Sequence, residues 1–315
     1  GFLQATSTNN SGLLSAATLD FSLEQFAPGN SAAVIGSGPF TITEETIGST
    51  LTLTARDDYD WAPPTRGHEG RPYLDEVRIS VTPEDSVRVG GLISGQADLI
   101  RAVEAQDEAQ VRDSGFTVYA PQTNGVNNHL SLRFRGDVLA DIRVRQALIA
   151  GIDRQEVIDV IYTDSYPLAT SILSKGAVGY INTEDAFAFD AKRAERLLDE
   201  AGWLPGAGGI REKNGVSLTL VANESAAQAR SFEALTLISQ QLAKIGVDLQ
   251  ILKADAGTAA EAVRDGDRVQ LSHAMVARAD LDVIKSEFYS TNRNTLLNLN
   301  YDDTSIGDEQ LEELL

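Results

Sequence analysis

Three histidines are the residues of this sequence best suited to bind a metal ion or to transfer protons near neutral pH. They are His68, His129 and His273, and no pair has the His-x-x-x-His or His-Glu-x-x-His spacing that puts two imidazoles on one helix face. The chain has no cysteine, which excludes thiolate metal sites and cysteine nucleophiles. The sequence therefore predicts no metal site, no cofactor and no catalytic residue.

Arginines recur in the segment DIRVRQALIAGIDRQEVIDVIY, which covers residues 141–162. Its apolar residues fall at positions i, i+3, i+4 and i+7 of one helical face: Val144, Ala147, Leu148 and Gly151. Asp141 and Asp153 are placed to cap two successive helices. The arginines lie off the apolar face, and a formal net charge of −20 opposes binding to a phosphate backbone. We interpret the segment as scaffold and expect no nucleic-acid partner.

The glycine-rich segment GAGGIRE, which begins at Gly206, is a candidate phosphate loop. It follows Trp203-Leu-Pro rather than a strand, and no Gly-Lys-Ser/Thr comes after it. We interpret it as the start of a hairpin. Tyr59 and Trp61 are interpreted as packing aromatics rather than as a platform for a ligand.

An α/β fold is expected to position these residues, because predicted strands alternate with predicted helices. A length of 315 residues exceeds one hydrophobic core, so two compact units are expected. Alternation of apolar and polar residues predicts strands at 36–44, 49–57, 74–83, 217–222 and 247–253. The helical period predicts helices at 142–151, 154–162, 191–201 and about 226–245, the third capped by Asp190 and ended by Gly202.

The boundary between the two units is expected in the polar segment TNGVNN, residues 123–128, in which asparagines favour turns. Before it, a short helix is predicted to end near Gly95, with a strand from about Ala97. Further strands are predicted at 117–122 and 129–134. We expect a lead segment at 1–35, one unit at 36–125 and another at 126–315.

Several segments, in chain order, resemble motifs of the family 5 extracellular solute-binding proteins, the peptide, nickel and oligosaccharide receptors of ABC importers. DIRVRQALIAGIDRQEVID is similar to the family's D-x-RVRQAL-x-x-AIDR. GSGPF resembles G-T-G-P-Y, SGQADL resembles S-G-E-I-D, and FDAKRAERLLDEAGW resembles Y-D-P-E-K-A-K-x-L-L-x-E-A-G-W. The ordered series covers roughly residues 36–315.

The resemblance implies a two-lobed α/β fold of the type II periplasmic-binding-protein kind. The first lobe would be incomplete at 36–125, and 126–315 would form most of the second lobe. Family members carry further segments before G-T-G-P-Y and after the point where this sequence stops, so we expect a fragment. The implied function is capture of a peptide or other small solute and its delivery to ABC permease subunits, outside the cell or in the periplasm, with a lipid anchor on the full-length protein.

The family binds its ligand with loops at strand ends, where open α/β sheets generally bind ligands. Asn223, Glu224 and Ser225 follow a predicted strand and are candidate ligand contacts; the alternative is a solvated loop whose Asn or Ser caps the next helix. Asn127 and Asn128 lie at the expected crossing between the lobes. They are candidates for lining the cleft or the hinge, and turn formation is the alternative.

The segment LSHAMVARADLDVIKSEF, residues 271–288, resembles the stretch in which peptide-binding members carry a tryptophan and an aspartate that receives the ligand's amine. This sequence has no aromatic residue at the position of the tryptophan, and Ala277 occupies the position nearest to that of the family's aspartate. The family's usual peptide recognition is therefore not expected. The remaining candidate contacts are His273, Met275, Arg278 and Asp280, with a hydrogen-bonded structural histidine and an arginine paired to Asp280 or Asp282 as the alternatives.

Two other classes of protein stay open from the sequence. One is a hydrolase that uses paired carboxylates, for which the 46 acidic residues supply many chance pairs but no recognisable framework. The other is a fragment without a ligand that docks to a permease or another partner. We expect a non-catalytic receptor.

Overall fold

The structure is a computed structural model that describes residues 14–26, 29–64, 67–133, 138–225, 227–265, 267–277 and 282–288, and residue 313. Two compact units divide the chain, Gly1–Val103 and Glu104–Leu315. The boundary between lobes that the sequence places at residues 125 and 126 stays a prediction.

The unit Gly1–Val103 contains a three-stranded antiparallel sheet in the order β1-β2-β3. The tight turn between the first two strands contains Gly48, whose φ of 69° lies in the left-handed region that glycine adopts without strain. The three strands expected from the alternating pattern are confirmed. The elements of this unit are η1 (Ala16–Asp20), η2 (Leu23–Phe26), η3 (Ser31–Ala33), β1 (Phe40–Thr46), β2 (Thr50–Ala55), β3 (Glu76–Ser80) and α2 (Asp85–Ile93).

The aromatic pair of this unit packs as the sequence predicts. The ring centroids of Tyr59 and Trp61 lie 4.9 Å apart in an edge-on arrangement. The indole Nε1 of Trp61 donates a hydrogen bond to the carbonyl of Ser37, 2.9 Å away, and Tyr59 is buried. The Trp61 hydrogen bond thus ties the segment between β2 and β3 to the entry to β1, although Trp61 is 46% exposed.

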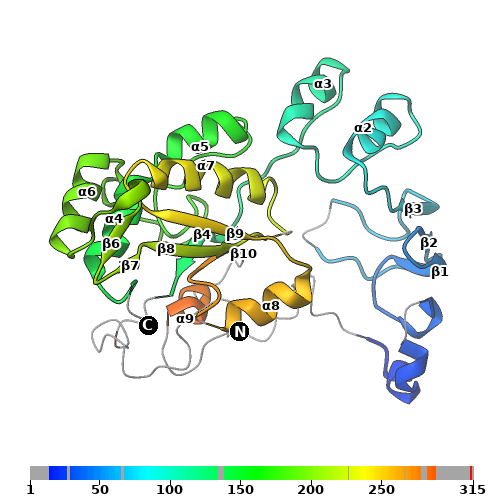
Figure 1. The fold of residues 1–315 in the computed structure, drawn as a ribbon. Coiled ribbons are helices and arrows are strands. Elements are labelled where there is room, and N and C mark those ends of the chain that lie inside the picture. Colours follow the sequence, from blue (N-terminus) through cyan, green and yellow to red (C-terminus); the bar gives the residue numbers. More distant parts are fainter. Residues whose placement is uncertain are drawn as a thin grey trace. The chain divides into compact units, whose positions relative to one another are not determined.

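The unit Glu104–Leu315 is built on a four-stranded sheet in the order β4-β10-β8-β9 (Figure 1). β8, β9 and β10 run parallel, and β4 is antiparallel to β10. The sheet strands are β4 (Gly125–Leu132), β8 (Thr219–Asn223), β9 (Asp248–Leu252) and β10 (Leu271–Ala277). A small antiparallel sheet joins β5 (Leu204–Pro205), β6 (Arg211–Lys213) and β7 (Val216–Ser217). The segment GAGGIRE therefore lies in the β5–β6 hairpin, as predicted.

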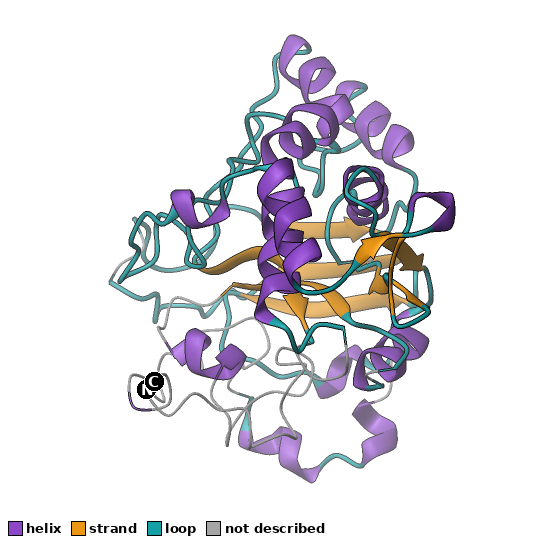
Figure 2. Ribbon diagram, turned by 60° about the vertical axis from the view of Figure 1, so that its left-hand side comes forward, coloured by secondary structure: helices purple, strands orange, loops and turns teal. Residues whose placement is uncertain are grey.

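Helices cover both faces of the four-stranded sheet (Figure 2). The core on one face joins α4, α6 and α7 to the strands through Leu148, Leu198, Leu235 and Leu220. On the other face Val263 of α8 packs against Val269, and Val283 of α9 packs against Val126. The helices of this unit are η4 (Ala105–Asp107), α3 (Glu108–Asp113), α4 (Ile142–Gly151), α5 (Arg154–Ile161), η5 (Glu184–Phe187), α6 (Ala191–Glu200), η6 (Ala207–Gly209), α7 (Ser231–Ala243), α8 (Ala256–Arg264) and α9 (Asp282–Phe288).

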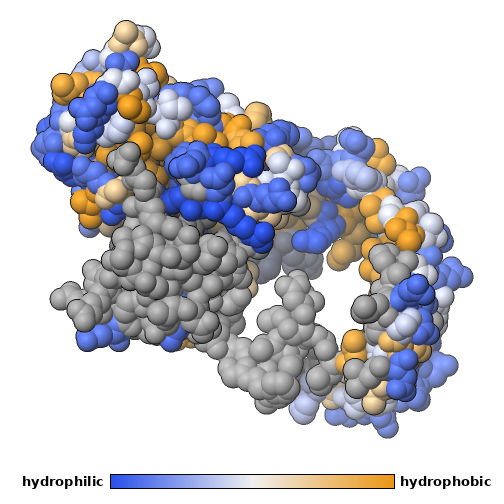
Figure 3. Space-filling model, turned by 60° about the horizontal axis from the view of Figure 1, so that its bottom comes forward, coloured by the Kyte–Doolittle hydropathy of each residue, from blue (hydrophilic) through white to orange (hydrophobic). Residues whose placement is uncertain are grey.

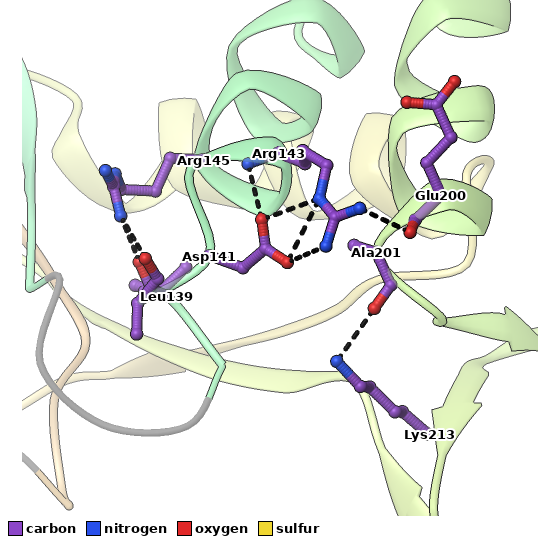
Figure 4. A network of polar contacts seen from close by, with 8 residues as sticks. Leu139, Asp141, Arg143, Arg145, Glu200, Ala201 and Lys213 are labelled. Carbon is purple, nitrogen blue, oxygen red and sulfur yellow. Dashed lines mark hydrogen bonds and ion pairs between the residues drawn. The ribbon is translucent and has the colours of Figure 1, made fainter.

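The arginine-rich segment is scaffold, as predicted. The side chain of Asp141 caps α4 by accepting from the Arg143 N–H, and Asp153 caps α5 in the same way through the Glu156 N–H. Figure 4 shows the Arg143 guanidinium between the carboxylate of Asp141 and the backbone carbonyl of Glu200 in α6. Arg145 donates to the carbonyls of Leu139 and Ala140. These two arginines thus fix α4 against its neighbours.

The predicted helix limits are most accurate where a capping residue marks the start or the end of the helix. α4, α5 and α6 match the predicted ranges to within one residue, and Asp190 and Gly202 have their predicted places at α6. α7 begins at Ser231 rather than near residue 226, because Arg230 has a left-handed φ of 55° that helical backbone cannot contain.

Three local predictions are wrong. Residues 97–100 and 117–122 form no strand, because neither segment finds a partner strand for its backbone groups within the part of the chain that the structure describes. Conversely, Gly125–Asn128 of the expected loop form the start of β4. Their pairing with β10 outweighs the turn preference of the asparagines.

Candidate functional site

The predicted contacts of the second unit that the structure describes gather at one edge of the four-stranded sheet. Because β8, β9 and β10 are parallel, their carboxyl ends point the same way. Asn223 ends β8, where it pairs with Leu252 of β9 and with Ser272 of β10. Since β10 begins level with the end of β8, His273 and the residues after it extend beyond the last residue of β8. We call this place the carboxyl edge; it comprises residues 223–231, 252–255 and 273–277 and the start of β4.

A hydrogen-bond relay connects the loop after β8 to β10. The backbone N–H of Ser225 donates to Oγ of Ser231 at 3.0 Å. The Ser231 Oγ lies 2.6 Å from Nδ1 of His273. The hydroxyl has one hydrogen and two lone pairs, so it can donate to a neutral Nδ1 while it accepts from the Ser225 N–H. In the tautomer with the ring proton on Nε2, Nδ1 of His273 is the acceptor of this contact.

His273 is neutral at physiological pH. Burial lowers its pKa to about 4, and the charge that His129 can carry acts in the same direction. A neutral imidazole suits the relay, because Nδ1 then accepts the Ser231 hydroxyl hydrogen. Nδ1 of His273 is thus hydrogen-bonded within the unit, as in the structural alternative, and its role as a ligand contact stays a prediction.

Two oxygen acceptors at the end of β8 have few partners. The side chain of Asn223 is buried, its Nδ2 donates to the carbonyl of Glu224 at 3.2 Å, and its Oδ1 has no hydrogen-bond partner among the described residues. The Glu224 side chain is 18% exposed, and its ion-pair partner Lys253, 3.8 Å away, is 68% exposed. The N-cap of α7 is Arg230, so neither Asn223 nor Ser225 caps that helix. The capping alternative for this loop is wrong.

A β-bulge brings three other predicted residues together. Ala274 of β10 pairs with His129, and Val276 pairs with Val126. Met275 on β10 is thus opposite both Asn127 and Asn128 on β4, and such bulges redirect side chains at the ends of strands. Met275 is 37% exposed and Asn128 is exposed, so both are accessible in the unit Glu104–Leu315.

The side chain and backbone of Asn127 have a structural role in this bulge. Its Nδ2 donates to the carbonyls of Ser171 and Leu173, at 2.8 and 3.0 Å. Its backbone N–H donates to the carbonyl of Ile172. The side chain therefore ties the start of β4 to the segment after α5, and it has no free donor left for a ligand.

The sequence did not reveal a buried pair on the face of the sheet that α9 covers. Nε2 of His129 lies 3.6 Å from Oε2 of Glu287, and Glu287 is 4% exposed. The Nδ1 of His129 donates to the carbonyl of Asn127 at 2.7 Å, so a second proton on the ring must sit on Nε2. Burial lowers the pKa of His129, but the bond to Glu287 and the Asn127 carbonyl outweigh it, and the net pKa is raised.

The remaining predicted contacts, Arg278 and Asp280, lie outside the residues that the structure describes. The structure therefore leaves their roles, and the alternative pairing with Asp280 or Asp282, as predictions. Ser231 and Glu287 were missed because their partners are 42 and more positions away in the sequence. Only the fold brings such residues together.

The described residues contain neither a metal-binding cluster nor a membrane-spanning helix. In the ranges that the structure describes, no three side chains of His, Asp or Glu are grouped so that they could hold a metal ion. Within the same ranges, no helix is both long and apolar enough to span a bilayer.

On the face drawn in Figure 3, hydrophilic residues cover much of the coloured surface and hydrophobic residues form smaller groups between them.

Known proteins share this fold and parts of this sequence. The family described as bacterial extracellular solute-binding proteins, family 5 middle, matches residues 4–290. The oligopeptide-binding protein AppA of Bacillus subtilis is 26% identical over 219 residues, which are 69% of this chain and 39% of that protein. The chain thus spans about two fifths of the length of this relative.

Solved structures support the fold. The chain is similar to NikA from Brucella suis in complex with Fe(III)-EDTA, with a TM-score of 0.69, 24% identity and coverage of 84% of this chain and 52% of that one. It is also similar to DppA from Helicobacter pylori in complex with the peptide STSA, with a TM-score of 0.73, 21% identity and coverage of 99% and 57%. The predicted fold class, an α/β fold of the type II periplasmic-binding-protein kind, is confirmed.

Proposed function

Because the chain belongs to the bacterial extracellular solute-binding proteins of family 5, we propose that it is the substrate-binding part of an ABC importer. It would bind a small solute outside the cytoplasm and present it to permease subunits of a membrane. The observation that carries the proposal is the match to the family over residues 4–290, which includes every element of the carboxyl edge that the structure describes. We propose a lipid anchor on the full-length protein and lobes at 36–125 and 126–315.

The carboxyl edge of the second unit supports binding rather than chemistry. Ser231 and His273 form the one hydroxyl–imidazole contact of this edge in the part of the chain that the structure describes. Ser231 is 3% exposed, and its oxygen also accepts from Ser225. A serine nucleophile needs an oxygen that is free to attack a substrate carbonyl, whereas the Ser231 oxygen is held between the Ser225 N–H and His273. We therefore propose a receptor without catalytic activity.

The proposed ligand contacts combine loop and strand residues. Asn223, Glu224 and Ser225 would contribute from the end of β8, and Met275 and Asn128 from the bulge between β4 and β10. His273 would act through its Nε2–H, in the tautomer in which Nδ1 accepts from Ser231. Asn127, whose amide hydrogens are already used, would hold the bulge in shape. Arg278 and Asp280 stay candidates in the segment after β10.

The relatives' ligands suggest the first solutes to test. Names of similar proteins include an oligopeptide-binding protein, and one similar structure holds a peptide while another holds a metal chelate. Calorimetric titration of the chain with di-, tri- and tetrapeptides and with Fe(III)-EDTA and nickel–histidine chelates tests the proposal. We expect saturable binding of one class, weakened at least tenfold (about 1.4 kcal/mol) by Met275→Asp at the bulge. Turnover of any of these compounds, or binding of none of them, would contradict the proposal.

A further inference from the structure

At the carboxyl edge, the side-chain acceptors of Asn223 and Glu224 lack strong hydrogen-bond donors from the described residues. Asn223 is 6% exposed, and its Oδ1 is buried with no donor to it in the part of the chain that the structure describes. Leaving such an acceptor unpaired costs roughly 1–3 kcal/mol, so a buried acceptor of this kind calls for a donor. Because Nδ2 of the same amide is held by the Glu224 carbonyl, turning the amide over would only exchange one unpaired atom for another.

The neighbouring carboxylate is also short of donors. The side chain of Glu224 is 18% exposed, so it has lost much of its contact with water. Its ion-pair partner Lys253 lies 3.8 Å away, is 68% exposed and also lies over the ring of Phe232, 4.8 Å from the ring centroid. An exposed pair at this distance contributes between 0 and about 1 kcal/mol, which offsets little of the desolvation of the carboxylate.

The other cation of this edge is committed elsewhere. Arg230 donates from Nη1 to Oε1 of Gln106, 3.0 Å away, and its Nε lies 3.5 Å from Oε1 of Glu233. The edge therefore presents one buried neutral acceptor and one partly buried anion in successive residues, with no strong donor from the described residues directed at either.

We propose that Asn223 and Glu224 form a subsite for a cationic donor group of the solute, an ammonium or a guanidinium. The charge would meet the Glu224 carboxylate, and one N–H would be donated to Oδ1 of Asn223. This inference rests on the proposed function and adds the chemical class of the solute. The subsite lies at the end of β8, on a different strand from Ala277 at the end of β10.

The test uses two probes of similar size in titrations of the isotope-labelled chain followed by NMR. Argininamide carries an ammonium and a guanidinium and has no carboxylate, and N-acetylcitrullinamide has a similar shape and no charge. We expect argininamide to bind at least tenfold more tightly than N-acetylcitrullinamide (about 1.4 kcal/mol). Among the signals of the labelled chain, the side-chain amide of Asn223 should show the largest chemical-shift change. Equal binding of the two probes, or binding of neither, would overturn the subsite.

Variants separate the charge of the subsite from its shape. Glu224→Gln keeps the shape and should remove the preference for argininamide, whereas Lys253→Ala removes the competing cation and should strengthen argininamide binding about threefold. Glu195→Gln, at an exposed position of α6, is the control and should change nothing. If Glu224→Gln retains the preference, the inference is wrong. Binding of neutral peptides or chelates without any preference for cations would leave the proposed function standing and remove only the subsite.

Discussion

The hydroxyl of Ser231 lies 2.6 Å from Nδ1 of His273, and this hydrogen bond joins the first residue of α7 to strand β10. Through the Ser225 N–H, which donates to the same hydroxyl, the loop after β8 has a fixed attachment to the strand beside it. A protonated Nδ1 would instead donate to the Ser231 oxygen, so protonation would reverse the direction of this hydrogen bond. What opposes protonation is burial, which disfavours the charged imidazole.

Acidification is predicted to destabilise the unit Glu104–Leu315 through His273. Its pKa falls from an ordinary value near 6.5 to about 4 on folding. Between these values the unfolded chain binds the proton and the folded chain does not, so stability falls as pH falls from 6.5 to 4. The shift corresponds to a loss on the order of 3 kcal/mol. Urea unfolding of the chain at pH 7, 5.5 and 4 measures it.

The control for this prediction removes the imidazole itself. His273→Asn should flatten the dependence of unfolding free energy on pH between 6.5 and 4. Equal slopes for the unchanged chain and for His273→Asn would show that the buried imidazole is not the source.

His129 is predicted to have the opposite dependence on pH. Its pKa in the folded chain is raised, chiefly because Glu287 and the Asn127 carbonyl outweigh the effect of burial. The stabilisation from its charged form is complete below pH 6.5 and is lost as pH rises through the raised pKa. Hydrogen exchange of the α9 amides should therefore accelerate as the pH rises from 6 to 8.5, beyond the intrinsic increase. In Glu287→Gln that extra acceleration should be absent; if it persists, the pair does not hold α9.

The sequence predicts local features of this fold and misses contacts between residues that are distant in the sequence. Helix limits at Asp141, Asp153 and Asp190 follow from local chemistry, since a capping carboxylate bonds an N–H two or three residues ahead. The family motifs are local as well. Contacts of His129 and His273, by contrast, join strands, helices and loops that are distant in the sequence. No spacing rule reaches across 42 residues, and lone histidines carry no pattern of their own.

The asparagines before His129 show the same limit in the backbone. Their composition favours a turn, and the structure places them in β4 because β10 and residues 171–174 supply partners on either side. The loop after β8 was correctly placed at a strand end. Its relay was not predictable, because Ser231 acquires its role only when Arg230 adopts a left-handed conformation and ends the loop there.

Removing the cap of α4 is predicted to cost about 1 kcal/mol of stability. Asp141 accepts from the Arg143 N–H at 2.9 Å and pairs with the guanidinium at 2.6 Å, which lowers the pKa of the carboxyl to about 2. Asp141→Ala loses both interactions. Asp141→Asn keeps an oxygen for the cap and should lose only the partly exposed ion pair, a few tenths of a kcal/mol. If urea unfolding shows equal losses of unfolding free energy in Asp141→Ala and Asp141→Asn, the ion pair, not the cap, stabilises the helix.

Two helix-ending glycines offer a matched pair that separates backbone strain from crowding. Gly115 after α3 and Gly246 after α7 have φ values of 88° and 84°, so an alanine at either costs about 1–2 kcal/mol in the left-handed region. At Gly115 a Cβ would meet nothing within 4 Å, but at Gly246 it would lie 2.6 Å from Cγ of Arg211.

Arg211 cannot move aside to admit that carbon. Its guanidinium is buried, donates to the carbonyls of Ile245 and Trp203 at 2.8 and 2.7 Å, and pairs with Asp199. Gly246→Ala should therefore lose a further 1–3 kcal/mol, roughly, beyond the loss in Gly115→Ala, since overpacking of a fixed site adds to the strain. Urea unfolding of the two variants measures the difference. Equal losses would mean that the Arg211 side chain yields, and its three contacts would then be weaker than their geometry implies.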